Sequence, residues 1–109
     1  MIKYANLKKM FLKLDFPITE FNLEEGDLEI PIPSGVYIPG KEKPVFADGS
    51  NYFSLMEVQL ELLTEKVDFE KRKKVEEILE NNDVSFTVET EYSNDHRIYS
   101  TIYSFEVIV

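Results

Sequence analysis

The residues that could carry acid–base, nucleophilic or metal chemistry are few, and their spacing matches no familiar catalytic pattern. His96 is the only histidine, and it falls in a polar stretch, residues 93–97, that predicts an exposed turn. With no second histidine and no cysteine in the chain, His96 is not expected to hold a metal or to act as a catalytic base. Ser50 and Ser54 lack the GxSxG elbow that exposes a nucleophilic serine. The sequence therefore predicts no catalytic nucleophile.

Loops that bind phosphate or metal ions are not predicted either. The glycines at positions 35, 40 and 49 have neither the GxGxxG nor the GxxxxGK spacing of a phosphate-binding loop. A group of acids could offer the oxygen ligands that Ca²⁺ and Mg²⁺ prefer. Its members are Glu24, Glu25, Asp27 and Glu29. Because these acids lack the Asp-x-Asp-x-Asp-Gly pattern of a calcium loop, we expect no bound metal. Since the sequence predicts neither a nucleophile nor a phosphate-binding loop, we also expect no cofactor and no enzymatic activity.

Composition narrows the class of protein further. The chain has 109 residues, which is enough for a single domain over residues 1–109, and it has no cysteine for disulfides. The formal net charge of −9 argues against binding nucleic acid by neutralising its phosphates. No stretch approaches the ~20 apolar residues of a membrane span, and the start of the chain does not predict a signal peptide. We expect a small acidic protein that works away from membranes.

The charges are distributed unevenly along the chain. Residues 1–13 contain four lysines, among them Lys8 and Lys9, and no acidic residue. The charged residues of the segment 14–40 are all acidic, and they include Glu24 and Glu25. Two solvated faces are the ordinary interpretation of such a pattern. The two segments could also meet between neighbouring subunits, in a head-to-tail ring.

The first half of the chain predicts one helix and short, interrupted strands. Tyr4, Leu7, Phe11 and Leu14 recur at helical spacing, with lysines on the other side, and Pro17 ends the pattern. Such an amphipathic helix most commonly covers a sheet. Short strands are expected at residues 19–23 and 35–38. Residues 39–43 predict a loop and Asp48-Gly49 a turn, so that residues 39–50 should project from the sheet and be mobile.

Residues 52–63 form the strongest predicted strand. Met56, Val58, Leu60 and Leu62 alternate with Glu57, Gln59 and Glu61. This alternation is typical of an antiparallel sheet with one buried and one solvated face. Because the run contains no proline or glycine, we expect a long central strand.

The second half predicts a helix followed by a hairpin. Asp68 is expected to cap a helix that ends at Asn81, with the basic run of residues 71–74 on a solvated face. Strands are predicted at residues 86–92 and 98–109, and Tyr103, Phe105, Val107 and Val109 are assigned to one face of the last. The predicted fold class is α+β, with a mainly antiparallel sheet of four or more strands and two helices packed on one face.

Three stretches within residues 46–109 form a common pattern, namely "FADG", "VQLELLTEKVDFEKRKKVEEILENNDVSF" and "ETEY" followed by "IYSTIYSFEV". They resemble the siphophage tail-completion or tail-terminator family, whose members join heads to tails. The start is similar in its short helix and in "EEG" before a proline-rich strand. The sequence departs from the family pattern in "DLEIPIPSGVYIPGKEKPV".

The resemblance implies a structural protein of the virion neck that is assembled in the host cytoplasm. Such proteins form a ring, typically of six subunits, that stops growth of the tail tube and joins the tail to the head connector. The implied partners are other copies of the chain, the major tail tube protein and the head–tail connector protein, while DNA passes through the ring without specific binding. The interface residues expected are Lys8, Lys9, Glu24, Glu25, Lys41 and Lys43. The alternative from another class is a small acidic inhibitor or binding module that blocks a basic partner surface.

Overall fold

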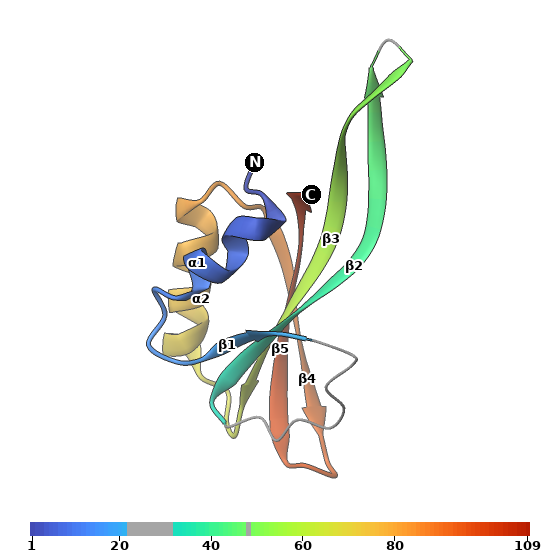
Figure 1. Cartoon of the computed structure of the whole chain (residues 1–109). Coiled ribbons are helices and arrows are strands. Elements are labelled where there is room, and N and C mark those ends of the chain that lie inside the picture. The colour runs from blue at the N-terminus through green and yellow to red at the C-terminus, as the bar shows by residue number, and fades with distance from the viewer. Residues whose placement is uncertain (22–31, 48) are drawn as a thin grey trace.

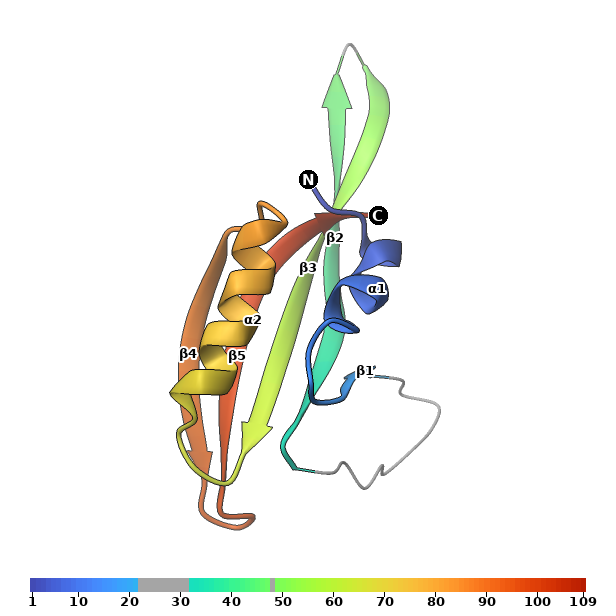
Figure 2. The same ribbon diagram turned by 90° about the vertical axis from the view of Figure 1, so that its left-hand side faces the viewer.

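The fold of the chain is α+β, with one five-stranded sheet layered against helices (Figure 1). The structure is a computed structural model that describes residues 1–21, 32–47 and 49–109. The elements in chain order are η1 (Tyr4–Asn6), α1 (Leu7–Phe11), β1 (Ile18–Glu20), β2 (Ser34–Ala47), β3 (Ser50–Thr64), α2 (Phe69–Asn81), β4 (Phe86–Ser93) and β5 (Ile98–Ile108). The strand order is β1-β2-β3-β5-β4, and α1 and α2 lie on the same face of the sheet (Figure 2). The predicted fold class is therefore confirmed.

Strand β3 is the centre of the sheet, as its alternating sequence predicts. It pairs antiparallel with β2 on one side and with β5 on the other. The inward residues Val58, Leu60 and Leu62 are buried against the helices, whereas Glu57 and Gln59 between them are exposed on the opposite face. We call that opposite face, which the helices leave uncovered, the open face.

Helix α2 begins and ends as the sequence predicts. The carboxylate of Asp68 accepts a hydrogen bond from the backbone N–H of Lys71 at 3.1 Å, which satisfies one of the free donors of the first turn. Val75 and Leu79 are fully buried on the side that faces the sheet. After the helix, Asp83 adopts a positive φ of 58°, the left-handed conformation common at helix ends.

Helix α1 is shorter than its apolar pattern predicts. It ends at Phe11, so Leu14 lies beyond it and is only half-buried. The packing is nevertheless the predicted one, because Leu7, Met10 and Phe11 are buried while the lysines of the helix are exposed. The Phe11 ring lies against the Tyr37 ring of β2, with 5.6 Å between the centroids. The short helix therefore covers the β2 side of the sheet.

The prediction for residues 35–43 is wrong, because they form no short strand followed by a loop. Strand β2 runs without a break from Ser34 to Ala47 and pairs with β3 along its length, with register shifts between Pro39 and Glu42 and between Val45 and Phe46. The prolines are tolerated because β1 lies beside β2 only as far as Tyr37, so the outer side of β2 is a free edge from there on. The predicted turn is confirmed at Gly49, whose φ of 78° suits a residue without a side chain.

The remaining strands agree with their predictions in type and differ at their ends. The strand predicted at residues 19–23 is β1, which spans Ile18–Glu20 and runs parallel to β2, while residues 22 and 23 lie outside the described residues. Strands β4 and β5 form the predicted hairpin. Tyr103 and Val107 are fully buried, but Val109 lies beyond the end of β5 and is exposed, since no element covers it.

Candidate interaction surfaces

The residues that the sequence offers for acid–base or metal chemistry lie at different places in the chain, some of them outside the described residues. His96 lies exposed in the turn between β4 and β5, where its backbone N–H points at the Ser93 hydroxyl at 3.4 Å. Within residues 1–21, 32–47 and 49–109, no three His, Cys, Asp or Glu side chains are placed to hold a metal. The acids considered as oxygen ligands (Glu24, Glu25, Asp27 and Glu29) lie outside the described residues. What the described part of the chain offers instead is a set of exposed surfaces.

The first surface is a two-stranded ribbon that projects beyond the sheet. We use the name ribbon for residues 41–47 and 49–55, the far end of the β2–β3 hairpin (Figure 1). Strand β5 accompanies β3 only as far as Leu55, so beyond that point the two ribbon strands pair chiefly with each other. The protein is consequently elongated, with extents of 51 × 31 × 23 Å.

The ribbon carries two aromatic side chains that the described residues leave partly or largely exposed. Phe46 is 63% exposed and Phe53 is 40% exposed. Phe53 lies directly across the ribbon from Val45, so apolar groups from both strands share one place. Single exposed apolar residues are ordinary, but a cluster on a projecting arm is typical of a contact surface.

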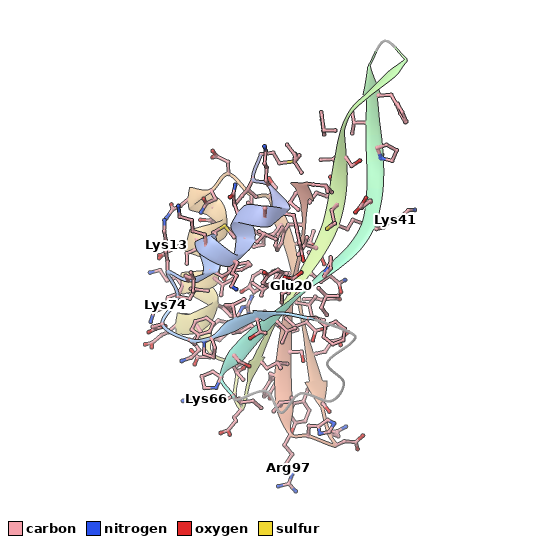
Figure 3. All side chains as sticks on the ribbon, in the orientation of Figure 1. Lys13, Glu20, Lys41, Lys66, Lys74 and Arg97 are labelled. Carbon is pink, nitrogen blue, oxygen red and sulfur yellow. The ribbon has the colours of Figure 1, made fainter. Side chains whose placement is uncertain are left out.

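The base of the ribbon combines charges of both signs. Lys41, Lys43, Leu55, Glu57 and Glu106 line a small hollow of about 80 Å³. Figure 3 shows Lys41 pointing away from the helices, on the side of the open face. The hollow is too small for a ligand of drug size. The two lysines predicted as interface residues therefore lie close together, at the foot of the arm.

The second surface is acidic and spans the open face of the sheet. Cross-strand pairing places five glutamates there, namely Glu57, Glu61, Glu89, Glu91 and Glu106. Glu57 and Glu106 are direct partners across β3 and β5, an arrangement of like charges that opposes folding. Burial, together with the nearby Glu91, raises the pKa of Glu61 above its usual range. The open face is thus a surface of concentrated negative charge.

The third surface is the outer edge of β4. This strand is the last of the sheet, and its residues from Thr87 to Tyr92 are all exposed. Its eight residues contain neither proline nor lysine, two of the devices that protect an edge strand from pairing with other chains. Where β4 begins, a hollow of about 390 Å³ opens at the surface, and Val84, Phe86 and Phe105 are among the residues that line it.

The basic residues of the two helices do not form a further interaction surface of this kind. Lys8 and Lys9 are exposed on α1, but Glu24 and Glu25, the acids predicted to meet them, lie outside the described residues. In the basic run of α2, the Lys74 ammonium contacts the Asp15 carboxylate at 2.8 Å, which lowers the pKa of Asp15. This run therefore serves partly to join α2 to the segment after α1.

Sequence reasoning missed the aromatic tip and the edge of β4 as sites. The letters "PVF" and "YF" on either side of the Asp48-Gly49 turn were the available signal, since apolar residues rarely gather beside an exposed turn. Lys41 and Lys43 were found, although in a predicted loop instead of a strand.

The comparisons with known proteins identify no relative of the chain. No protein-family model and no curated protein sequence matches the chain. Among the helices that the structure describes, none has the length and apolar character needed to cross a membrane.

Proposed function

We propose that the chain is a structural protein of a phage neck, which forms a ring that ends the tail tube and joins the tail to the head connector. The observation that carries the proposal is the ribbon, an arm that extends from a well-packed body and exposes aromatic side chains at its end. An arm of this kind suits a protein that works by contacting other subunits. The sequence resemblance described above supplies the identity of those subunits.

The energetics of the ribbon support a role in assembly. Burying a phenylalanine side chain contributes about 1.5–3 kcal/mol, and the free subunit leaves this contribution unused at Phe46 and partly at Phe53. A two-stranded ribbon on its own is only marginally stable, so it gains from contact with a partner. Both effects favour a protein whose arm is completed by assembly.

A ring also requires two different surfaces that complement each other. Heterologous contacts between identical subunits close into a ring when the rotation between neighbours permits it. The ribbon base is basic at Lys41 and Lys43, whereas the strand at the other side of the sheet, β4, has Glu89 and Glu91 and no basic residue. The net charge of −9 keeps isolated subunits apart, so we expect little stable oligomer before the protein meets the tail.

The acidic open face suits a ring through which DNA passes. Proteins that grip DNA do so by placing lysine and arginine against its phosphates. A lumen lined by glutamates such as Glu57, Glu61 and Glu106 would repel the phosphates and leave the DNA free to slide. This role would also explain why like charges are held side by side on β3 and β5.

The proposal is tested by disrupting the gene in the phage that encodes the chain. We expect tails that grow past their normal length and filled heads that remain unjoined, with both defects repaired when the wild-type chain is supplied. Genes for a major tail protein and a head–tail connector should lie beside this gene. Tails of normal length joined to heads in the absence of the chain would refute the proposal.

A second candidate function is a small acidic inhibitor that occupies a basic partner surface. The observation that favours it is the open face, which carries five glutamates of three neighbouring strands. The two functions differ in stoichiometry and location. An inhibitor would be recovered as a single copy bound to a basic host enzyme, and a neck protein would be recovered in purified virions.

A further inference from the structure

Among the residues that the structure describes, the ribbon and the outer edge of β4 have no partner on their outer sides. They lie on different strands of the sheet, since β4 is its last strand and the ribbon extends β2 and β3. Both expose apolar groups, because Val88 and Tyr92 on β4 are 38% and 49% exposed. The β4 edge of one copy could therefore be the docking site for the ribbon of a neighbouring copy.

The charges of the two elements are complementary and equally spaced. On the ribbon, Lys43 and Lys41 lie three and five residues before Phe46; on the β4 edge, Glu89 and Glu91 lie three and five residues after Phe86. At about 3.3 Å per residue in a regular strand, intervals of three and five residues are roughly 10 and 17 Å, and on the ribbon they lie between the register shifts beside Lys41 and Phe46. Two such strands laid antiparallel would set the aromatic rings together and each lysine near one glutamate.

The β4 edge also has a place for the aromatic tip. The hollow of about 390 Å³ where β4 begins is lined in part by Val84, Phe86 and Phe105, and its acidic residues are Asp83 and Glu106. A hollow lined by both apolar and acidic residues could receive an arm that has an exposed phenylalanine near its end and two lysines at its base. Clustered aromatic rings gain further from edge-to-face contact.

The competing ways of pairing these edges are disfavoured. If two β4 edges paired antiparallel about Thr90, Glu89 of one copy would face Glu91 of the other, and like charges directly opposite are destabilising. Pro44 on the ribbon, and Pro39 just before it, remove backbone donors from β2, which limits its use as an added strand. The contact is therefore carried mainly by side chains.

We propose that the ribbon of one copy docks along the β4 edge of the next copy, with Phe46 at the hollow beside Phe86, Lys43 against Glu89 and Lys41 against Glu91. The inference rests on the proposed function, since it describes the contact that closes the neck ring. It also specifies which residues of the ribbon lie opposite which residues of β4, and assembly of a ring alone does not require that register.

The test uses the fact that the chain has no cysteine of its own. Tails are assembled in cells that express two variants together, Lys43→Cys and Glu89→Cys, and purified tails are treated with a short bis-maleimide. The expected product is a dimer that joins position 43 of one copy to position 89 of another. The matched control pairs Lys43→Cys with Glu77→Cys, which removes the same type of charge from an exposed position of α2, and should give no dimer.

A charge-reversal series tests the same register without cross-linking. Lys41→Glu with Lys43→Glu should reduce capped tails by at least tenfold, and adding Glu89→Lys with Glu91→Lys in the same chain should restore most of them. Restoration supports the inference, because no merely structural role of either strand predicts mutual rescue.

Failure of this docking inference can be distinguished from failure of the proposed neck function. Rings that cap the tails but give dimers only through other positions, or only between the ribbon and the tail tube protein, would overturn the register while leaving the neck function intact. Purified tails that contain no copies of the wild-type chain would overturn both.

Discussion

The two ends of the β2–β3 hairpin have the same secondary structure and opposite environments. In the body of the protein, Val58, Leu60 and Leu62 of β3 are buried beneath the helices. A few residues earlier on the same strand, Phe53 is 40% exposed, and across the turn Phe46 is 63% exposed. Strand pairing in this hairpin therefore continues past the residues that the helices bury, and the ribbon adds little to the buried core.

We therefore expect stability and interaction to depend on different parts of one strand pair. Substitutions in the body should change the free energy of unfolding and alter assembly only through loss of the fold. Substitutions in the ribbon should change assembly and leave the free energy of unfolding nearly untouched. The predictions below test this separation, beginning with the largest expected change in stability.

Leu60→Lys should destabilise the protein by about 4 kcal/mol or more, because it places an unpaired charge where the side chain is fully buried. Since domains of this size are stable by about 5–15 kcal/mol, much of the variant should be unfolded near physiological temperature. Gln59→Lys is the matched control, since the neighbouring side chain is exposed on the open face. Urea denaturation measures both, and equal midpoints for Leu60→Lys and the wild type would show that the inward face is misassigned.

Asp68→Ala should cost about 1 kcal/mol, the usual value of a helix N-cap. The hydrogen bond from the backbone N–H of Lys71 is the main cause that lowers the pKa of Asp68 in the folded state. A lowered pKa stabilises the fold above the unfolded value, about 3.9, and this contribution disappears as the pH falls through the folded value. The difference between wild type and variant, measured by denaturation at pH 7 and pH 3, should therefore shrink at the lower pH. A constant difference would argue against the cap.

These body features are also the ones that the sequence predicts best. The alternation of Val58, Leu60 and Leu62 with polar residues, and the cap at Asp68 before an apolar helical pattern, are local signals that the packing does not override. Such agreement between local preference and fold is expected where a residue serves stability.

The ribbon was harder to predict for a physical reason. Pro39, Gly40 and Pro44 argue for a loop when the chain is read by itself, yet pairing with β3 holds them in a strand whose outer edge is free. The length of the arm depends on where β5 stops at Ile108, which is a property of the sheet and not of residues 39–50. The lysines at its base were identified from charge alone.

Glu61→Gln should raise the stability at neutral pH by up to about 0.5 kcal/mol, the range of most surface substitutions. Burial, with the nearby Glu91, raises the pKa of Glu61 in the folded state. A raised pKa means that the fold loses stability as the pH rises from the ordinary glutamate value through the folded value. The gain of the variant should therefore be present at pH 7 and vanish near pH 3. Glu77→Gln, which removes one charge from α2, is the control, and an equal gain there would attribute the effect to net charge alone.

The double variant Phe46→Ser with Phe53→Ser should change the melting temperature of the free subunit by no more than about 2 °C, because Phe46 is 63% exposed, Phe53 is 40% exposed and neither belongs to the buried core. Amide hydrogen exchange should likewise be faster for residues 44–47 and 50–53 than for residues 57–63, since local opening is easiest where few buried contacts are lost. Exchange in the ribbon as slow as in the body would mean that the arm is not free in the isolated subunit.

The central claim, that the body supports an arm which assembles a neck ring, is tested most directly by cryo-electron microscopy of the head-proximal end of purified tails. The account predicts a closed ring of copies at that end, with each ribbon lying along β4 of its neighbour and the open face towards the central channel. A tail end that contains no copy of the chain, or a ring in which the ribbons contact nothing, would contradict it.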